Sequence, residues 1–145
     1  MTQVEWKDLA HGQAWATKQL KELKRPCVVL ICGEMGAGKT QLVRWWVEAL
    51  GGSAVASPTF AIHHQYSTPQ GPIDHVDLYR LTSDADLESS GFWDLFENDH
   101  GLVFVEWADR LPDSVWPAAW TKIKVQIAKV PGQGDLVRRV QIQNL

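Results

Sequence analysis

Eight consecutive residues in the first third of the chain have the types and spacing of a phosphate-binding loop. Residues 33–40 read GEMGAGKT, which fits the pattern G-x-x-x-x-G-K-[ST]. Glycines let successive backbone N–H groups face an anion, a lysine at the seventh position reaches the β- and γ-phosphates, and the following hydroxyl is offered to a magnesium ion. The residues expected to enclose the phosphates are Gly33, Glu34, Met35, Gly36, Ala37, Gly38, Lys39 and Thr40.

The segments on either side of this loop are the ones that its chemistry requires. Residues 27–32, CVVLIC, form an apolar run without alternation, which is typical of a central parallel strand covered on both faces. After the loop, residues 42–50 place apolar side chains on one face, which predicts a helix that ends at residues 51–52, two glycines. A glycine turn that only reverses the chain is the competing interpretation, and the strand, loop and helix together count against it.

The site also needs a carboxylate that holds the metal, and two acids compete for that role. Glu106 follows the uninterrupted apolar strand at residues 102–105, so its carboxylate should emerge at the carboxyl edge of the sheet, beside the loop. We therefore expect Thr40 and Glu106 to hold magnesium. Asp77 ends a more polar strand and could lie near the attacking water, but an ion pair with Arg80 is an alternative for it.

The remaining residues favour ATP over other phosphate ligands. A guanine site commonly uses an Asn/Thr-Lys-x-Asp segment, and the nearest match, TKIK at residues 121–124, lacks the acid. A small-substrate kinase needs clustered arginines, but the arginines of this chain are scattered along it. Arg138 shares a strand face with apolar residues, so we expect it to have an anionic partner, either a nucleotide phosphate or an acid of the fold.

The whole chain reads as a single domain, residues 1–145, with an α/β fold. Helical periodicity covers residues 8–23, and a further helix begins near Ser83. Strand-like runs at 60–67 and 73–78, and at 122–129 and 136–143, predict two antiparallel hairpins. We expect a P-loop NTPase-like three-layer sandwich, with a mixed, mainly parallel central sheet and antiparallel additions.

Composition excludes several classes of protein. The chain has 14 Lys and Arg against 17 Asp and Glu, a net charge of −3, which is the wrong sign for gripping nucleic acid by phosphate neutralisation alone. The longest apolar run is far shorter than the roughly 20 residues of a membrane span, and the amino terminus has no secretory pattern, so we expect a cytoplasmic protein. Cys27 and Cys32 should point to opposite strand faces as buried, reduced thiols.

Four motifs together resemble those of the bacterial TsaE family. They are GEMGAGKT at residues 33–40, SPTF at 57–60, HVDLYRL at 75–81 and VEW at 105–107, in the order and at about the spacing of that family. The motifs extend over half of the chain, and the total length and the closing hairpin also suit the family.

The resemblance implies a weak, magnesium-dependent ATPase that supports formation of threonylcarbamoyladenosine on tRNAs reading codons that begin with A. The family works with the transferase TsaD and its paralogue TsaB, and ATP hydrolysis is thought to reset that complex between rounds. We therefore expect TsaD-like and TsaB-like partners, indirect contact with tRNA, and neither DNA nor a membrane as a partner.

The resemblance, followed motif by motif, assigns the family's site residues to positions of this chain. Ser57 and Thr59 fall in a switch region near the γ-phosphate, Glu106 is the metal acid and Asp77 is the second catalytic acid. Trp107 abuts the metal acid, and we expect it to sense the nucleotide. The expected catalytic residues are Lys39, Thr59, Asp77 and Glu106. Two other functions stay open, a small-substrate P-loop kinase and a nucleotide-gated binding module in which hydrolysis is incidental.

Overall fold

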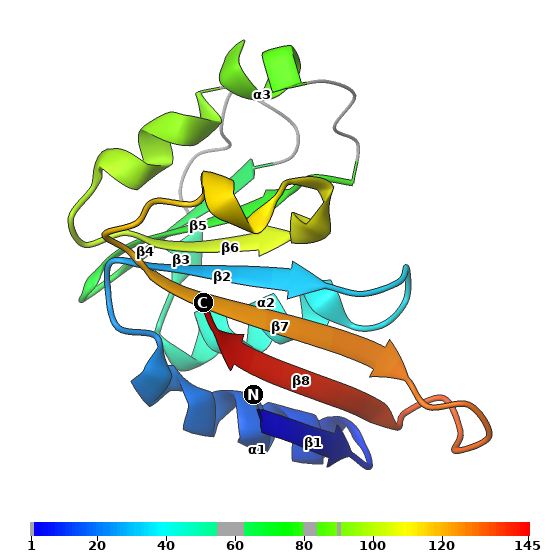
Figure 1. Ribbon diagram of the computed structural model, residues 1–145. Coiled ribbons are helices and arrows are strands. Elements are labelled where there is room, and N and C mark those ends of the chain that lie inside the picture. The colour runs from blue at the N-terminus through cyan, green and yellow to red at the C-terminus, as the bar shows by residue number, and fades with distance from the viewer. Residues whose placement is uncertain (1, 55–62, 80–83, 90) are drawn as a thin grey trace.

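The computed structural model describes residues 2–54, 63–79, 84–89 and 91–145, and it has one sheet as its centre (Figure 1). The strands are β1 (Thr2–Trp6), β2 (Cys27–Cys32), β3 (Ser53–Ala54), β4 (His63–Thr68), β5 (Gly71–Asp77), β6 (Leu102–Glu106), β7 (Thr121–Lys129) and β8 (Arg138–Asn144). Within the described residues they form an eight-stranded sheet in the order β1-β8-β7-β2-β6-β5-β4-β3.

The sheet is mixed, as predicted, but it is partly rather than mainly parallel. Strands β7, β2, β6 and β5 are parallel neighbours, and the pairs β1/β8, β8/β7, β5/β4 and β4/β3 are antiparallel. The share of parallel pairs is lower than predicted because β1 and β3, which the sequence did not predict, each add an antiparallel pair at one edge of the sheet. The parallel centre places the carboxyl ends of β2, β5, β6 and β7 at one side of the sheet.

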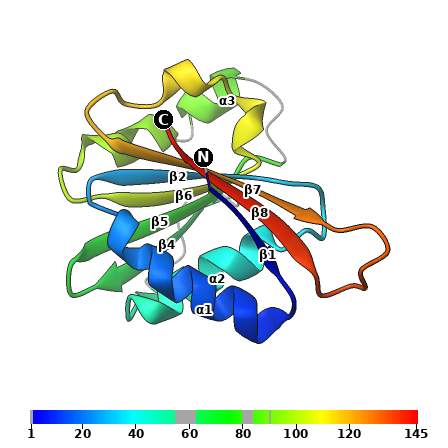
Figure 2. The same cartoon turned by 60° about the horizontal axis from the view of Figure 1, so that its bottom comes forward.

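Helices cover both faces of this sheet. The helical elements are α1 (Leu9–Gln19), η1 (Leu20–Glu22), α2 (Lys39–Ala49), α3 (Asp84–Ser89), η2 (Phe92–Glu97), η3 (Ala108–Arg110) and η4 (Asp113–Val115), in which η marks a 3-10 helix. Figure 2 shows α1 and α2 on one side of the sheet, and α3 with η2, η3 and η4 on the other. Among the described residues, no helix is long and apolar enough to cross a membrane.

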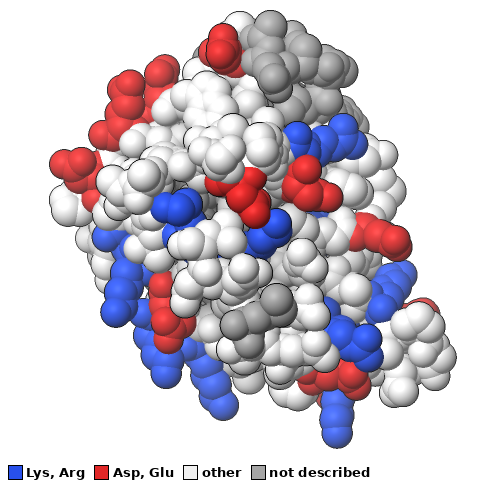
Figure 3. Space-filling model, in the orientation of Figure 1, with Lys and Arg blue, Asp and Glu red and all other residues white. Residues whose placement is uncertain are grey.

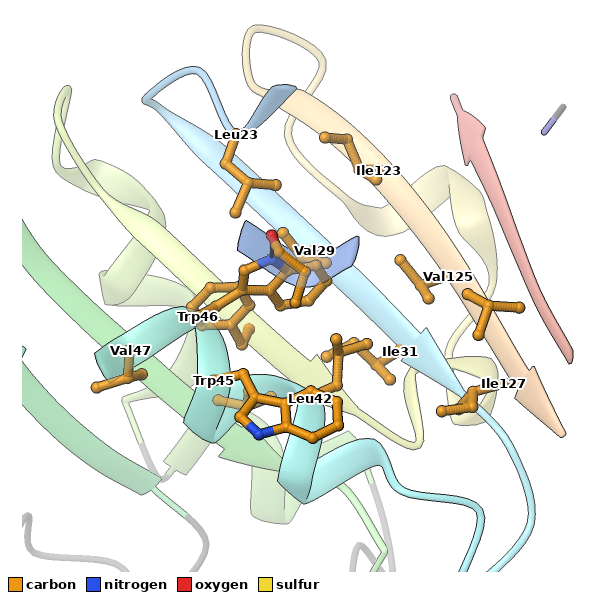
Figure 4. Packing of buried hydrophobic residues seen from close by; sticks show 14 of the residues in the cluster. Leu23, Val29, Ile31, Leu42, Trp45, Trp46, Val47, Ile123, Val125 and Ile127 are labelled. Atoms are coloured by element: carbon orange, nitrogen blue, oxygen red, sulfur yellow. Dashed lines mark hydrogen bonds between the residues drawn. The ribbon is translucent and has the colours of Figure 1, made fainter. Parts of the chain in front are cut away.

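The core beneath α1 and α2 holds α2 against the sheet. Trp46 is fully buried, its ring stacks on Phe104 at 5.4 Å between centroids, and its indole N–H donates to the Ala16 carbonyl at 2.8 Å. Figure 4 shows how Leu42 and Trp46 of α2 meet aliphatic side chains of β2 and β7. Truncating a buried aromatic side chain typically costs about 3–5 kcal/mol, so this packing strongly holds α2 against the sheet.

The opposite core covers the other face of β2 and β6. Phe92 is fully buried, and its ring lies edge-on against Trp116 at 6.0 Å between centroids. Val103 and Val105 of β6 pack into this cluster, while Phe104 packs into the first one. Strand β6 is therefore buried on both faces, and its side chains leave the apolar interior only where the strand ends.

The two cysteines are free and buried, as the sequence predicts. Cys27 packs into the core on the α1 and α2 side, and Cys32 into the opposite cluster. Burial raises the pKa of the Cys27 thiol to about 12, so it stays protonated at neutral pH.

Candidate functional site

The loop between β2 and α2 turns through two glycines in the left-handed region. Gly36 has a φ of 82° and Gly38, which precedes the first turn of α2, has a φ of 112°. The turn is closed by a hydrogen bond from the Ala37 N–H to the Glu34 carbonyl at 3.0 Å. A Cβ on Gly33 would lie 2.5 Å from the Ile127 carbonyl oxygen, so the loop also leaves the sheet at a position that admits no side chain.

Lys39 is folded back into this loop. Its side chain is almost wholly buried, and its Nζ donates to the Gly33 carbonyl at 2.6 Å and to the Glu34 carbonyl at 2.8 Å. Burial lowers the pKa of the Lys39 ammonium, although the carboxylates of Glu106 and Asp77 act to raise it. The ammonium therefore stands inside the loop, in a position to meet an anion held there.

Thr40 and Glu106 are joined directly, across 66 positions of sequence. The Thr40 hydroxyl is within 2.8 Å and 3.0 Å of the two Glu106 carboxylate oxygens, and Glu106 is only 2% exposed. Burial by itself would raise the pKa of Glu106, but the hydrogen bond and charge of His75, the Thr40 hydroxyl and the Lys39 charge together lower it. The carboxylate is therefore ionised at neutral pH.

Asp77 ends β5 beside Glu106, and both line one pocket. The two residues are register partners in the parallel pair β5/β6, and the Asp77 Oδ1 accepts a hydrogen bond from the Tyr79 N–H at 2.8 Å. The pocket has a volume of about 320 Å³. Its lining residues are Met35, Gly36, Gly38, Lys39, Thr40, Gln41, Asp77, Tyr79, Glu106 and Trp107.

Trp107 forms an aromatic wall of this pocket. The residue has a φ of 56°, a left-handed conformation that is uncommon for a bulky side chain. The Lys39 Nζ lies 4.1 Å from its ring centroid, and the Tyr79 ring centroid lies 5.0 Å away. The guanidinium carbon of Arg110 is 5.6 Å from the Tyr79 ring and 5.9 Å from the Trp107 ring. Two cations therefore lie beside the aromatic wall, the Lys39 ammonium and the Arg110 guanidinium.

A second, larger pocket adjoins the other side of the loop. Its volume is about 750 Å³, and it shares Met35 and Trp107 with the first pocket. It extends from the loop over the last residues of β7, where Gln126, Lys129 and Pro131 contribute to its lining. The loop is thus flanked by a small pocket that contains the acids and a larger one beside β7.

Arg138 meets no acid among the described residues. Its guanidinium instead donates hydrogen bonds to backbone carbonyls, among them those of Ala37 at 2.7 Å and Val137 at 3.0 Å. Of the two anionic partners that the sequence left open, an acid of the fold is not found among these contacts, and a nucleotide phosphate stays a prediction. Four carbonyl oxygens accept from the guanidinium, which accounts for a half-buried arginine on an apolar strand face without a counter-ion.

Of the residues that the sequence singled out, the structure gathers Lys39, Thr40, Asp77, Glu106 and Trp107 around one pocket. Ser57, Thr59 and Arg80 lie outside the described residues, as does Ser83. In the described ranges, no group of three His, Cys, Asp or Glu side chains is placed to hold a metal.

Several residues at the site were missed. His75 contacts the buried Glu106 carboxylate through its Nε2, and Tyr79 lines the pocket. Both belong to the segment HVDLYRL, and the alternation of a strand puts the side chains of residues 75 and 77 on the same face. That spacing was the signal for His75. No comparable signal marked Arg110, which contacts Tyr79 and Trp107 only through its folded position.

Comparison with known sequences finds one family. A family model described as "Threonylcarbamoyl adenosine biosynthesis protein TsaE" matches residues 3–136. The tRNA threonylcarbamoyladenosine biosynthesis protein TsaE of Synechocystis sp. is 35% identical over 108 residues, which are 72% of this chain and 69% of that protein. The proteins of the same name from Haemophilus influenzae and Bacillus subtilis are 33% and 30% identical, over 73% and 79% of this chain and 68% and 73% of their own lengths.

Comparison with solved structures finds a similar fold. The crystal structure of YdiB from Bacillus subtilis superposes with a TM-score of 0.58 and covers 97% of this chain and 84% of its own. The two sequences are 24% identical, so this likeness bears on the fold alone.

Proposed function

The chain belongs to the TsaE family, and from that premise we propose that it is a magnesium-dependent ATPase, folded as one P-loop NTPase-like domain, that supports threonylcarbamoyladenosine modification of tRNA. One observation carries the proposal. The Thr40 hydroxyl at the start of α2 is hydrogen-bonded to the Glu106 carboxylate at the end of β6, so the phosphate loop and the strand acid form one site.

The loop supplies the phosphate cradle. Its amides and the positive end of α2, an eleven-residue helix, attract the phosphates, and Lys39 places an ammonium among them. That ammonium now holds two loop carbonyls, at Gly33 and Glu34. A phosphate oxygen would accept part of the hydrogen bonding that the Lys39 ammonium now gives to these carbonyls. It would also place a negative charge opposite the buried cation.

Thr40 and Glu106 fit a magnesium ion. Their hydroxyl and carboxylate oxygens are the hard ligands that Mg²⁺ prefers, and Glu106 is ionised. The protein supplies few ligands here, which suits an ion that keeps several waters and completes its shell with phosphate oxygens. When bound, the ion supplies charge neutralisation for the phosphates. Asp77, on the same pocket, orients or deprotonates the attacking water.

The larger pocket beside β7 is proposed to bind the nucleoside of ATP. It begins at the loop on the side away from Asp77 and Glu106, and its volume of about 750 Å³ falls in the range of small-molecule sites. Glutamine side chains at positions 126 and 141 give it amide groups that can hydrogen-bond a base. A triphosphate can thus span both pockets, with its terminal phosphate toward the acids.

Partners of the TsaD and TsaB types complete the proposal, and any contact with tRNA is made through them. On the face shown in Figure 3, acidic and basic side chains are interspersed, in keeping with a net charge of −3. Thr59 and Ser57 are proposed to respond to the γ-phosphate. An arginine delivered by a partner would raise turnover by about 10³–10⁵, as trans-acting arginines do in related chemistry.

The test is hydrolysis of ATP by the purified chain with and without magnesium, alone and with TsaD-like and TsaB-like proteins. We expect slow, magnesium-dependent release of phosphate that the partners accelerate. Release that requires a small-molecule acceptor would establish a kinase instead. Repeated rounds of tRNA modification with a non-hydrolysable ATP analogue would establish a nucleotide-gated binding module.

Trp107 should report nucleotide binding by its fluorescence. Its ring lies 4.1 Å from the Lys39 ammonium, so a phosphate that draws the ammonium away changes the ring's surroundings. We expect ATP to quench the fluorescence of the wild-type chain, and Trp107→Phe to remove most of that quenching. Trp93→Phe is the control, because Trp93 lines neither of the two pockets beside the loop. Equal quenching in the wild-type chain and Trp107→Phe would contradict the assignment.

A further inference from the structure

Arg138 of β8 reaches the back of the phosphate loop. Its Nε donates to the Ala37 carbonyl at 2.7 Å and its Nη2 to the Gly36 carbonyl at 3.4 Å. Its Nη1 donates to the Asp135 carbonyl and, at 3.0 Å, to the Val137 carbonyl. One side chain therefore bridges the loop and the segment that leads into β8.

The loop carbonyls that Arg138 binds determine the direction in which the neighbouring N–H groups of the loop point. A trans peptide is planar, and its C=O and N–H point in opposite directions. With the Ala37 carbonyl drawn toward Arg138, the N–H of the next residue, Gly38, points away from it. Gly36 and Gly38 are both in the left-handed region, where glycine has many alternatives open to it, so this arrangement is not enforced by local sterics.

Among the described residues, no other hydrogen bond of the loop holds the Ala37–Gly38 peptide. The loop's internal hydrogen bond runs from the Ala37 N–H to the Glu34 carbonyl, and Lys39 holds the carbonyls of Gly33 and Glu34. These bonds order the first half of the loop. Arg138 acts on the second half, next to the start of α2, and its positive charge adds to the field that favours an anion there.

We propose that Arg138 is a positioning residue that holds the phosphate loop in its anion-binding conformation, so that the β7–β8 hairpin is part of the nucleotide site. This rests on the proposed function, because the ligand in question is ATP. The family model matches residues 3–136, so Arg138 lies outside the matched segment.

The test separates nucleotide affinity from turnover. We would measure the Kd for ATP by calorimetry, and kcat and KM for hydrolysis, for the wild-type chain, Arg138→Met and Arg138→Lys. Losing a charge-assisted hydrogen bond that orders the loop should raise the Kd and KM of Arg138→Met about tenfold and leave kcat at saturating ATP nearly unchanged. Arg138→Lys should restore part of the affinity, because an ammonium can reach one carbonyl but cannot bridge several.

Arg25 provides a matched control for general loss of stability. Its Nη1 also donates to backbone carbonyls, those of Pro72 at 2.5 Å and His100 at 2.7 Å. Arg25 precedes β2, so it lies at the opposite end of that strand from the loop. Arg25→Met should lower the midpoint of thermal unfolding without changing the Kd for ATP.

Two results would overturn the role of Arg138. One is an Arg138→Met chain that binds ATP as tightly as the wild-type chain. The other is an Arg25→Met chain whose affinity falls as far as that of Arg138→Met, since a loosened fold would then explain both. A wild-type chain that takes up no ATP would overturn the proposed function itself, and the role of Arg138 with it.

Discussion

Replacing Lys39 with alanine is expected to abolish detectable ATP binding and to lower hydrolysis by at least about 10²-fold, the scale seen when one positioned donor is removed from a charged transition state. The ammonium is the cation enclosed by the loop, and it is bonded to two loop carbonyls at 2.6 and 2.8 Å. Without it the loop keeps its amides but loses the charge that faces the β- and γ-phosphates.

The fold should survive this change. Burial disfavours the charged form of Lys39 and lowers its pKa, so we expect removal of the charge to offset part of the loss of the two hydrogen bonds. Lys122→Ala is the matched control, because its Nζ also binds carbonyls, of Pro117, Ala118 and Trp120, at the opposite end of β7. Circular dichroism and phosphate release would be measured on both variants. Hydrolysis by Lys39→Ala at the wild-type rate would refute the phosphate site.

Replacing Glu106 with glutamine is expected to remove the response to magnesium. The side chain keeps its shape, but an amide carries no charge for the metal, so we expect hydrolysis with Mg²⁺ to fall by about 10²-fold. Glu106→Ala should lose the same activity. It would also leave the buried His75 without its carboxylate partner, so the glutamine variant isolates the charge more cleanly.

Asp74 offers the control for Glu106, since it is another buried carboxylate in contact with a histidine. Its Oδ1 lies 2.6 Å from the His63 Nε2, on β5 and β4, and it does not line the pocket. Weakening a buried hydrogen bond typically costs about 1–3 kcal/mol of stability, so Asp74→Asn should unfold at a lower temperature. It should nevertheless keep its dependence on magnesium. An unchanged magnesium titration in Glu106→Gln would remove Glu106 from the metal site.

Local patterns predicted the elements that carry the site. The strand at residues 27–32, the loop and the helix after it are each specified by neighbours in sequence, and the buried β6 predicted that Glu106 emerges at its end. The edge strand β1 was missed for the opposite reason. Residues 2–6 are mostly exposed and polar, and they form a strand because they pair with β8, at the other end of the chain.

The side-chain partners at the site were harder to predict. The sequence predicted an anionic partner for Arg138, but its acceptors in the structure are backbone carbonyls, two of them about 100 residues away along the chain. A buried arginine suggests an acid or a phosphate as its partner, but every residue also offers a backbone carbonyl that can accept its hydrogen bonds. The left-handed conformation of Trp107 likewise has no sequence signal, since glycine or asparagine is the usual occupant.

The order of strands has a consequence for synthesis on the ribosome. The loop follows β2, yet the neighbours of β2 are β6 and β7, which begin at residues 102 and 121. A nascent chain that has exposed only its first hundred residues has the motif but neither flanking strand nor Glu106. Non-local parallel pairing of this kind forms slowly. If the proposed site binds ATP, we expect the nucleotide to stabilise the chain by mass action only once that pairing is complete, so ATP would stabilise the finished fold and would not guide its formation.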